Sequence, residues 1–261
     1  MAHIISEFVQ KGIVRLAINL PEKRNAISPN VRDEFLEAIS SCLFDENVSA
    51  IVLGSEGGHF CSGGDIDSMF GINVETGRRR MQRNHKLVRA IAEAEKPIVS
   101  AVEGFAMGAG AGICLLTDTI VVANNAKIGF PFFKVGLTPD YGILFTLPRR
   151  VGWARARQIL LRGTTWTGVD AVNNGLADEV VEAGSAERHA VEIAREMASA
   201  PPHAFSLTKR HLAMEPQCLE AALELETLSQ SLAFVGPEFT EGREAFLQKR
   251  RPDFERGKKI E

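Results

Sequence analysis

Three short apolar runs constrain the fold of this chain more than any other feature of its sequence. They lie at residues 50–53, 98–102 and 120–123, and none alternates between apolar and polar residues. Strands that are covered by helices on both faces have this composition, as in parallel sheets. Helical patterns at 75–95 and 108–117 lie between the runs. The order predicts an α/β fold built from strand–helix–strand units with right-handed crossovers.

The N-terminal residues predict a hairpin followed by a helix. Residues 4–9 and 13–19 are typical of two strands, with Lys11-Gly12 as the turn. Ser28 followed by Pro29 is a cap and then a proline at the first helical turn, which favours a helix start. Apolar residues recur every four positions after it, at Val31, Phe35, Ile39 and Leu43.

The second half of the chain is mainly helical in pattern. Helices are expected near 140–148, 153–161, 168–174, 186–199, 203–213, 217–233 and 238–248, with one strand at 179–182. Pro201-Pro202 interrupts this series. We therefore expect a core at 1–200 and a helical appendage at 201–261 that packs on a neighbouring subunit.

Bulk composition excludes several classes of function. The chain has 261 residues, 45% of them hydrophobic, and a net charge of −3, which favours one sizeable globular unit and no nucleic-acid partner. The six histidines lack metal-ligand spacing, so no metal is expected. The N-terminus has no signal-peptide pattern, and the longest uncharged run, 104–117, is too short and glycine-rich for a membrane span. Cytoplasmic location without membrane attachment is the expectation.

Two glycine-rich turns each follow a predicted buried strand. The first is 59–66 (His-Phe-Cys-Ser-Gly-Gly-Asp-Ile) and the second is 104–112 (Gly-Phe-Ala-Met-Gly-Ala-Gly-Ala-Gly). The second lacks the third glycine of a dinucleotide fingerprint, and no acidic residue stands where the ribose would need one. One backbone N–H from each turn can converge on a single oxygen, which would make an oxyanion hole.

Several motifs together resemble the enoyl-CoA hydratase/isomerase (crotonase) family. They are the two turns, in the same order and separation, the loop 21–27 (Pro-Glu-Lys-Arg-Asn-Ala-Ile), and the tail 246–254 (Phe-Leu-Gln-Lys-Arg-Arg-Pro-Asp-Phe). The resemblance covers essentially the whole chain. It implies a spiral of ββα units with a C-terminal helical trimerisation region, a homotrimer or dimer of trimers, and an acyl-CoA thioester as substrate. Coenzyme A is then part of the substrate, and no separate cofactor is expected.

The resemblance also assigns roles to individual residues. The N–H groups of Gly64 and Ala109 would hold the thioester oxygen. Contacts with CoA or the acyl group would come from Arg24, Ala26, Ser62, Gly63, Asp65, Ile66, Gly108, Phe132, Gly136, Phe246 and Lys249. The side chain of Asp65 could equally well cap the start of a helix.

Carboxylates decide which reaction an oxyanion hole serves. Hydratases of the family use two glutamates, and the matching positions here are Gly112 and Phe132. Asp140 remains, in a stretch where Thr138 and Pro139 resemble a cap and a first helical residue. Asp140 could act only by complementing the helix dipole. Several isomerases of the family, however, have a catalytic aspartate at this position. One carboxylate that moves a proton between two carbons suits an enoyl-CoA isomerase.

Other functions stay open on this sequence. Asp140 could act as a nucleophile, which would give hydrolysis or dehalogenation of an acyl-CoA. A hydratase-like lyase is a further alternative, and a catalytically silent CoA-binding module is another. Tyr141, the only tyrosine, could donate a hydrogen bond in the acyl pocket or be a packed aromatic residue. A basic run, Arg78-Arg79-Arg80, is interpreted mainly as a solvated helix face, with a smaller chance of a place near an anionic ligand.

Overall fold

The computed structural model describes residues 2–214 and 216–254. Its main sheet has six strands in the order β1-β2-β3-β4-β6-β9, and only the β1–β2 pair is antiparallel. The strands are β1 (Ile4–Gln10), β2 (Ile13–Ile18), β3 (Ala50–Ser55), β4 (Ile98–Val102), β6 (Thr119–Ala123) and β9 (Glu179–Val181). The predicted hairpin and the three predicted buried strands are confirmed.

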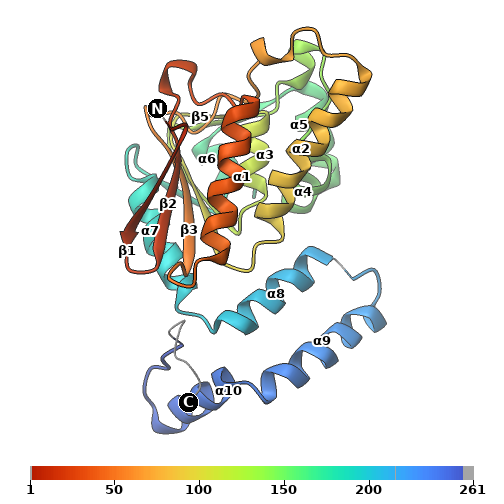
Figure 1. Ribbon diagram of the computed structural model, residues 1–261. Coiled ribbons are helices and arrows are strands. Elements are labelled where there is room, and N and C mark those ends of the chain that lie inside the picture. The colour runs from red at the N-terminus through yellow and green to blue at the C-terminus, as the bar shows by residue number, and fades with distance from the viewer. Residues whose placement is uncertain (1, 215, 255–261) are drawn as a thin grey trace.

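Helices cover both faces of this sheet (Figure 1). On one face α1 (Pro29–Phe44) and α2 (Val74–Ala92) pack against residues such as Ile51 and Leu53. On the other face α7 (Ala186–Ala198) packs against Ala50 and Val52. Because successive side chains of a strand point to opposite faces, double coverage explains why these runs are apolar at every position but Ser100. Ser28 caps α1 as predicted, since its Oγ accepts from the N–H of Val31 at 3.3 Å.

A second, three-stranded sheet lies beside the first. It consists of β5 (Phe105–Met107), β7 (Lys127–Gly129) and β8 (Thr165–Thr167). The buried helix α3 (Ala109–Leu115) follows β5 directly. Three further helices follow on this side: α4 (Ile143–Val151), α5 (Trp153–Arg162) and α6 (Gly168–Asn173). The second glycine-rich turn, 104–112, contains β5 and the first residues of α3.

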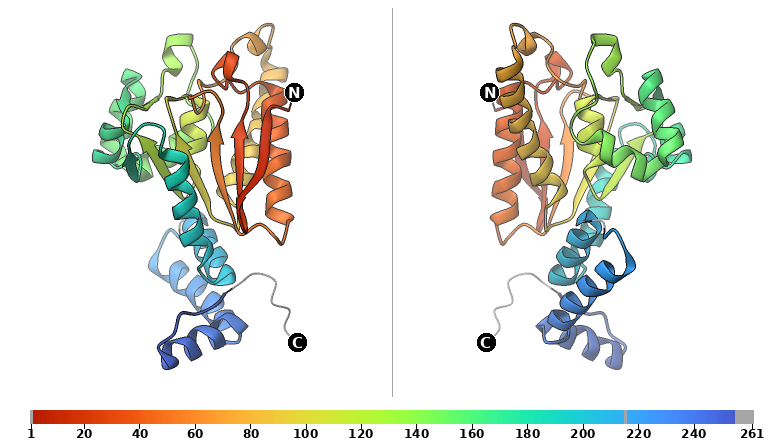
Figure 2. Two further views of the ribbon diagram at one scale, coloured as in Figure 1. Left: turned by 90° about the vertical axis from the view of Figure 1, so that its left-hand side faces the viewer. Right: turned by 90° about the vertical axis from the view of Figure 1, so that its right-hand side faces the viewer.

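The last three helices form an arm that projects from the core (Figures 1 and 2). They are α8 (Pro202–Met214), α9 (Leu219–Phe234) and α10 (Pro237–Gln248). The buried Lys209 of α8 fixes the base of the arm, because its ammonium donates to Asp118 Oδ2 at 2.7 Å and to the Lys96 carbonyl at 3.2 Å. The predicted appendage therefore exists as a helical region, although residues 255–261 of its range lie outside the described residues.

The predicted start of the helix near Asp140 is wrong. Thr138, Pro139 and Asp140 lie in a loop, and α4 begins only at Ile143. Gly142 precedes the helix with a left-handed φ of 76°, and Tyr141 is also left-handed at 51°. These two residues turn the chain sharply, so Asp140 stands before the helix rather than in its first turn.

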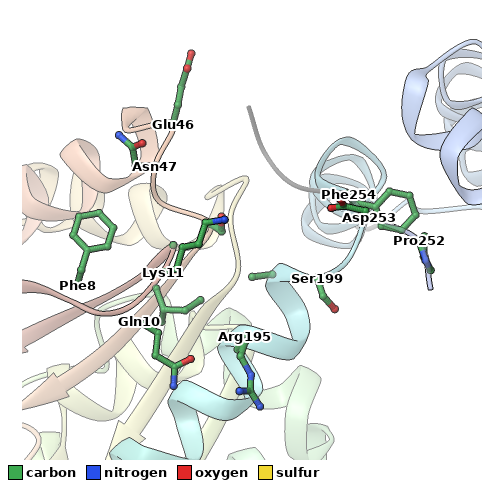
Figure 3. A pocket seen from close by; sticks show the side chains of 14 residues that line it. Phe8, Gln10, Lys11, Glu46, Asn47, Arg195, Ser199, Pro252, Asp253 and Phe254 are labelled. Atoms are coloured by element: carbon green, nitrogen blue, oxygen red, sulfur yellow. The ribbon is translucent and has the colours of Figure 1, made fainter. Parts of the chain in front are cut away.

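One large cavity lies at the end of the main sheet where β1 turns into β2 (Figure 3). It measures about 590 Å³ and is bordered by the β1–β2 turn, the end of α7 and residues 252–254. Its charged lining residues are of both signs: Lys11, Glu46, Arg195 and Asp253. Neither glycine-rich turn contributes to its described lining, and neither does Asp140. This cavity is therefore separate from the place where the two turns meet.

Candidate active site

The two glycine-rich turns lie side by side. The N–H of Cys61 donates to the Phe105 carbonyl at 2.7 Å, and the N–H of Met107 donates to the Cys61 carbonyl at 2.9 Å. This short parallel bridge joins the loop after β3 to strand β5. The turns therefore approach one another just beyond the bridge, as an oxyanion hole requires.

Glycine is needed at two positions of this approach. Gly63 has a φ of 112°, and a Cβ built on it would lie 3.2 Å from the Met107 carbonyl oxygen. Gly108 has φ 51° and ψ −111°, a combination that only glycine adopts without strain. Each glycine directly precedes one of the two predicted donor residues, Gly64 and Ala109. The glycines thus set the direction in which the next N–H points.

The N-terminal loop holds the first turn in place. The N–H of Ile27 donates to the Gly63 carbonyl at 2.8 Å, and the N–H of Asp65 donates to the Ile27 carbonyl at 3.1 Å. Asn25 is fully buried, and its Nδ2 donates to the carbonyls of Glu56 and His59 at 2.8 and 2.6 Å. Asn25 is a structural residue that the sequence analysis passed over.

The N–H groups of Gly64 and Ala109 have no protein acceptor among residues 2–214 and 216–254. Ala109 is the first residue of α3, where a backbone N–H has no partner within the helix. Both residues line one cavity of about 290 Å³. Two free donors at one cavity can hold a developing negative charge on a carbonyl oxygen.

Asp140 lines the same cavity. Its Oδ1 is buried and has no hydrogen-bond partner in the described part of the chain. Burial raises the pKa of this carboxyl to about 6; its own backbone N–H and the charge of Arg80 oppose the shift but do not cancel it. Because α4 begins three residues later, the effect of burial on this carboxyl outweighs that of the helix dipole.

Gly112 and Phe132 stand where the resemblance places the two glutamates of a hydratase. A Cβ on Gly112 would lie 2.6 Å from the Cβ of Tyr141, so the side chains around Asp140 occupy that space. Phe132 is buried and lines the cavity with its ring. Among the described lining residues, Asp140 is the one carboxylate.

We expect Gly112→Ala to lower the free energy of unfolding by about 1–3 kcal/mol, the usual cost of overpacking a core. In a helix, alanine alone would stabilise relative to glycine by about 1 kcal/mol. A lower free energy of unfolding would therefore indicate overpacking against Tyr141, and a higher one would indicate the gain in helix propensity. Urea unfolding of the parent protein and the variant measures this free energy. A stabilised variant would mean that the Tyr141 segment yields easily.

The predicted site residues divide into three groups. Cavity-lining residues are Ser62, Gly63, Gly64, Ile66, Gly108, Ala109, Phe132 and Asp140. Residues that belong to the adjoining loops but do not line the cavity are Arg24, Ala26, Asp65 and Gly136. Phe246 and Lys249 lie at the end of the arm, away from the cavity (Figure 1).

Asp65 does not cap a helix, contrary to its plainer interpretation. The next helical turn, η2 (Asp67–Met69), has no side-chain cap bond. The Asp65 carboxylate instead lies 3.4 Å from the Lys23 ammonium, while its backbone carbonyl accepts from the Ser68 hydroxyl at 2.6 Å. Asp65 thus ties the N-terminal loop to the first turn.

Two polar residues of α2, Arg80 and Asn84, also line the cavity. The basic run that contains Arg80 was interpreted mainly as a solvated face, and for Arg79 that is correct, since it pairs with Glu75 on the exposed surface. Asn84 was not considered at all. The i, i+4 spacing of Arg80 and Asn84 was the available signal, because it places both on one face of the helix.

In the described ranges, no group of three or more His, Cys, Asp or Glu side chains is arranged to hold a metal ion. None of the helices described is both long enough and apolar enough to cross a membrane.

Comparisons with known proteins agree with this geometry. The family model for enoyl-CoA hydratase/isomerase matches residues 9–257. The chain is 32% identical to 1,2-epoxyphenylacetyl-CoA isomerase of Escherichia coli (strain K12), over 97% of this chain and 99% of that protein. It is 31% identical to short-chain-enoyl-CoA hydratase of Clostridium acetobutylicum, over 90% and 91%. An enoyl-CoA hydratase structure from Polaromonas sp. JS666 superposes with a TM-score of 0.91 at 28% identity, covering 96% and 98%.

The α/β core thus presents two backbone N–H donors at one cavity, an arrangement that can stabilise an oxyanion. The chain belongs to the enoyl-CoA hydratase/isomerase family. Its relatives bear the names of both isomerases and hydratases, so the family by itself does not select the reaction.

Proposed function

We propose that this protein is an enoyl-CoA isomerase in which Asp140 is the acid–base group and the N–H groups of Gly64 and Ala109 form the oxyanion hole. The observation that carries the proposal is the Asp140 carboxylate. Its buried Oδ1 has no partner in the described structure and lies at the same cavity as the two free donors. Relatives named as isomerase and as hydratase both match nearly the whole chain, so the choice of isomerase rests on Asp140 and not on similarity.

The proposed reaction moves one proton and releases nothing. Ionised Asp140 removes a proton from the carbon next to the thioester carbonyl of a 3-enoyl-CoA. The electron pair delocalises onto the thioester oxygen, where the two N–H groups stabilise the dienolate. The same carboxyl then returns the proton to the far carbon, which gives the 2-enoyl-CoA. A pKa near 6 suits both halves of this cycle, because the group can accept and release the proton close to neutral pH.

Hydration by the family's two-glutamate route finds little support here. It needs one group to activate water and another to protonate carbon. Gly112 and Phe132 supply neither, and Asp140 is the sole carboxylate among the described lining residues. A nucleophilic role for Asp140, with hydrolysis of the thioester, remains the enzymatic alternative.

Product analysis in water labelled with heavy oxygen tests the proposal. The enzyme is incubated with 3-enoyl-CoA, 2-enoyl-CoA and aromatic acyl-CoA thioesters. A shifted double bond with no labelled oxygen in the product is expected. A labelled hydroxyacyl-CoA would indicate hydration, and labelled oxygen in a free acid would indicate the nucleophilic route. Binding without turnover of any of these thioesters would support the silent CoA-binding module.

We further propose that the arm makes the enzyme a trimer or a dimer of trimers, and that Phe246 and Lys249 meet the substrate of a neighbouring subunit. Phe246 is 83% exposed and belongs to α10, the last helix of the arm, and it is not among the described residues that line its own chain's cavity. Large apolar side chains are also exposed along α9: Leu219, Leu223, Leu228 and Leu232. So much exposed apolar surface on one element favours burial against another subunit.

Sedimentation velocity at micromolar concentration is expected to give at least a trimer. Leu223→Glu combined with Leu228→Glu is expected to produce smaller species, because each glutamate would bury a charge at the contact. Leu228→Met, which keeps the apolar surface, is the control and should sediment like the parent protein. A parent protein that sediments as a stable monomer would contradict the proposed assembly.

A further inference from the structure

The cavity has a polar wall on α2 that is separate from the two oxyanion donors, although the charge of Arg80 also opposes the rise in the pKa of Asp140. Arg80 and Asn84 line the cavity together, one helical turn apart on α2. The remaining lining includes apolar side chains such as Ile27, Met69 and Leu137, and four further polar residues from other elements: Ser62, Lys134, Asp140 and Tyr141. A hydrocarbon acyl chain would gain nothing from a guanidinium and an amide at this place.

Arg80 is oriented by hydrogen bonds and not by an ion pair in the described part of the chain. Its two terminal nitrogens donate to the carbonyl and the hydroxyl of Ser68, at 3.2 and 3.1 Å. Ser68 in turn donates to the Asp65 carbonyl, so Arg80 is fixed to the loop that carries Gly64. A guanidinium has five N–H donors, and these bonds use two of them. Among the residues that the structure describes, Arg80 makes no ion pair.

The amide of Asn84 is oriented by a residue behind it. The buried Arg32 donates from Nη1 to Asn84 Oδ1 at 3.2 Å. Because arginine has no acceptor, this contact fixes which end of the amide is oxygen. The Nδ2 end then faces away from Arg32, and its one described partner is the weak acceptor Met81 Sδ at 3.8 Å. Asn84 is therefore left with donor capacity beside that of Arg80.

We infer that Arg80 and Asn84 bind an acceptor oxygen on the acyl group, so that the preferred substrates are thioesters whose acyl chain carries a carbonyl or carboxylate oxygen beyond the reacting carbons. The inference rests on the proposed acyl-CoA function. Both groups offer donors and no free acceptor, so the complementary ligand is an oxygen acceptor rather than a hydroxyl or amine acting as donor. A carbonyl and a carboxylate share this chemistry, and the test separates them.

Saturated thioesters test the inference without turnover. The longer set compares 5-methylhexanoyl-CoA with 5-oxohexanoyl-CoA and glutaryl-CoA, which carry two methyls, one methyl and one oxygen, or two oxygens on C5. The shorter set compares 4-methylpentanoyl-CoA with 4-oxopentanoyl-CoA and succinyl-CoA. Affinities come from calorimetry. In at least one set, an oxygen-bearing ligand is expected to bind ~10-fold or more tightly than its hydrocarbon match, the size of one charge-assisted hydrogen bond.

Variants assign that preference to the two residues. Arg80→Met keeps an unbranched side chain and removes the donors. The ratio of the affinity for an oxygen-bearing ligand to that for its hydrocarbon match should therefore fall to about one. Asn84→Asp keeps the acceptor for Arg32 and replaces the amide donors with a carboxylate. It should reduce the same ratio of affinities, most strongly for the ligands that themselves carry a carboxylate. Arg79→Met makes the same change on the neighbouring residue, which is exposed and pairs with Glu75, and should leave the ratio unchanged.

The outcomes are distinct. If the hydrocarbon ligands bind as well as the oxygen-bearing ones in both sets, the inference is wrong while acyl-CoA binding stands. If Arg80→Met weakens all ligands equally, Arg80 acts on CoA or as a counter-ion of Asp140, and the inference is also wrong. If no thioester binds, the proposed function fails with it. Loss of the preference in Arg80→Met but not in Arg79→Met supports the inference.

Discussion

Replacing Gly64 with proline is expected to lower turnover ~100–1,000-fold, the usual effect of losing one oxyanion donor. Proline lacks the backbone N–H that we propose for the thioester oxygen. The backbone bonds that hold this turn use other groups, the Gly63 carbonyl and the N–H of Asp65. The Gly64 N–H has no partner in the described structure, so its removal costs no internal hydrogen bond.

Gly64→Ala is the matched control for this experiment. It adds a Cβ but keeps the N–H. That Cβ would lie 2.7 Å from Met69 Cε, the end of a flexible side chain that can move aside. We therefore expect a much smaller loss from alanine than from proline. Thermal unfolding and far-ultraviolet circular dichroism show whether both variants fold. A folded proline variant with normal turnover would show that other groups stabilise the oxyanion.

The main sheet could be predicted because its pattern is decided by burial. Residues such as Ile51 and Val52 face opposite helical layers, so both must be apolar. The three strands of the small sheet were not predicted. Each has only three residues, and Phe105–Met107 lies within a glycine-rich run that carries no strand periodicity. Their pairing depends on tertiary contacts that a local pattern does not contain.

The error at Asp140 has a specific cause. Thr138 and Pro139 form a local pattern that is typical of a helix start, but the left-handed Tyr141 and Gly142 delay the helix to Ile143. Glycine at 142 was visible in the sequence, whereas a left-handed tyrosine is uncommon and could not be anticipated. The consequence is chemical, because the carboxylate loses the helix dipole that would have kept its pKa low.

The candidate site was predictable only in part. Its backbone donors could be identified because glycine-rich turns and the family resemblance mark them in sequence. Arg80 and Asn84 come from a helix that carries no motif, and their meaning depends on Arg32, which lies 52 residues before Asn84. Such a pairing across elements appears only once α1 and α2 pack together.

Asp140→Asn is expected to lower turnover by at least ~100-fold, because asparagine keeps the shape of the side chain but cannot accept the proton. In the parent enzyme, kcat/KM should rise with pH through a midpoint near the carboxyl's pKa of about 6, as the base becomes ionised. The residual activity of the asparagine variant should lack this midpoint. Normal turnover by Asp140→Asn would exclude the residue from the mechanism.

The same substitution should stabilise the protein above pH 6. The folded-state pKa of Asp140 is raised from 3.8 to about 6, so the folded protein holds this proton more tightly than the unfolded chain does. The resulting stability is fully present below pH 3.8 and is lost as pH rises through 6. The loss amounts to about 3 kcal/mol at most, at 1.36 kcal/mol per pKa unit. Because asparagine stays neutral, the Asp140→Asn variant does not lose this stability.

Urea unfolding of the parent protein and of Asp140→Asn at low and high pH measures this difference. The two free energies of unfolding should agree at acidic pH, where both side chains are neutral, and diverge in favour of asparagine toward pH 8. A variant that is both less active and more stable would identify Asp140 as a group held in a costly ionised state for catalysis. Equal stability at pH 8 would mean that the ionised carboxylate is well solvated, and a carboxylate of that kind would be a weak base for removing a proton from carbon.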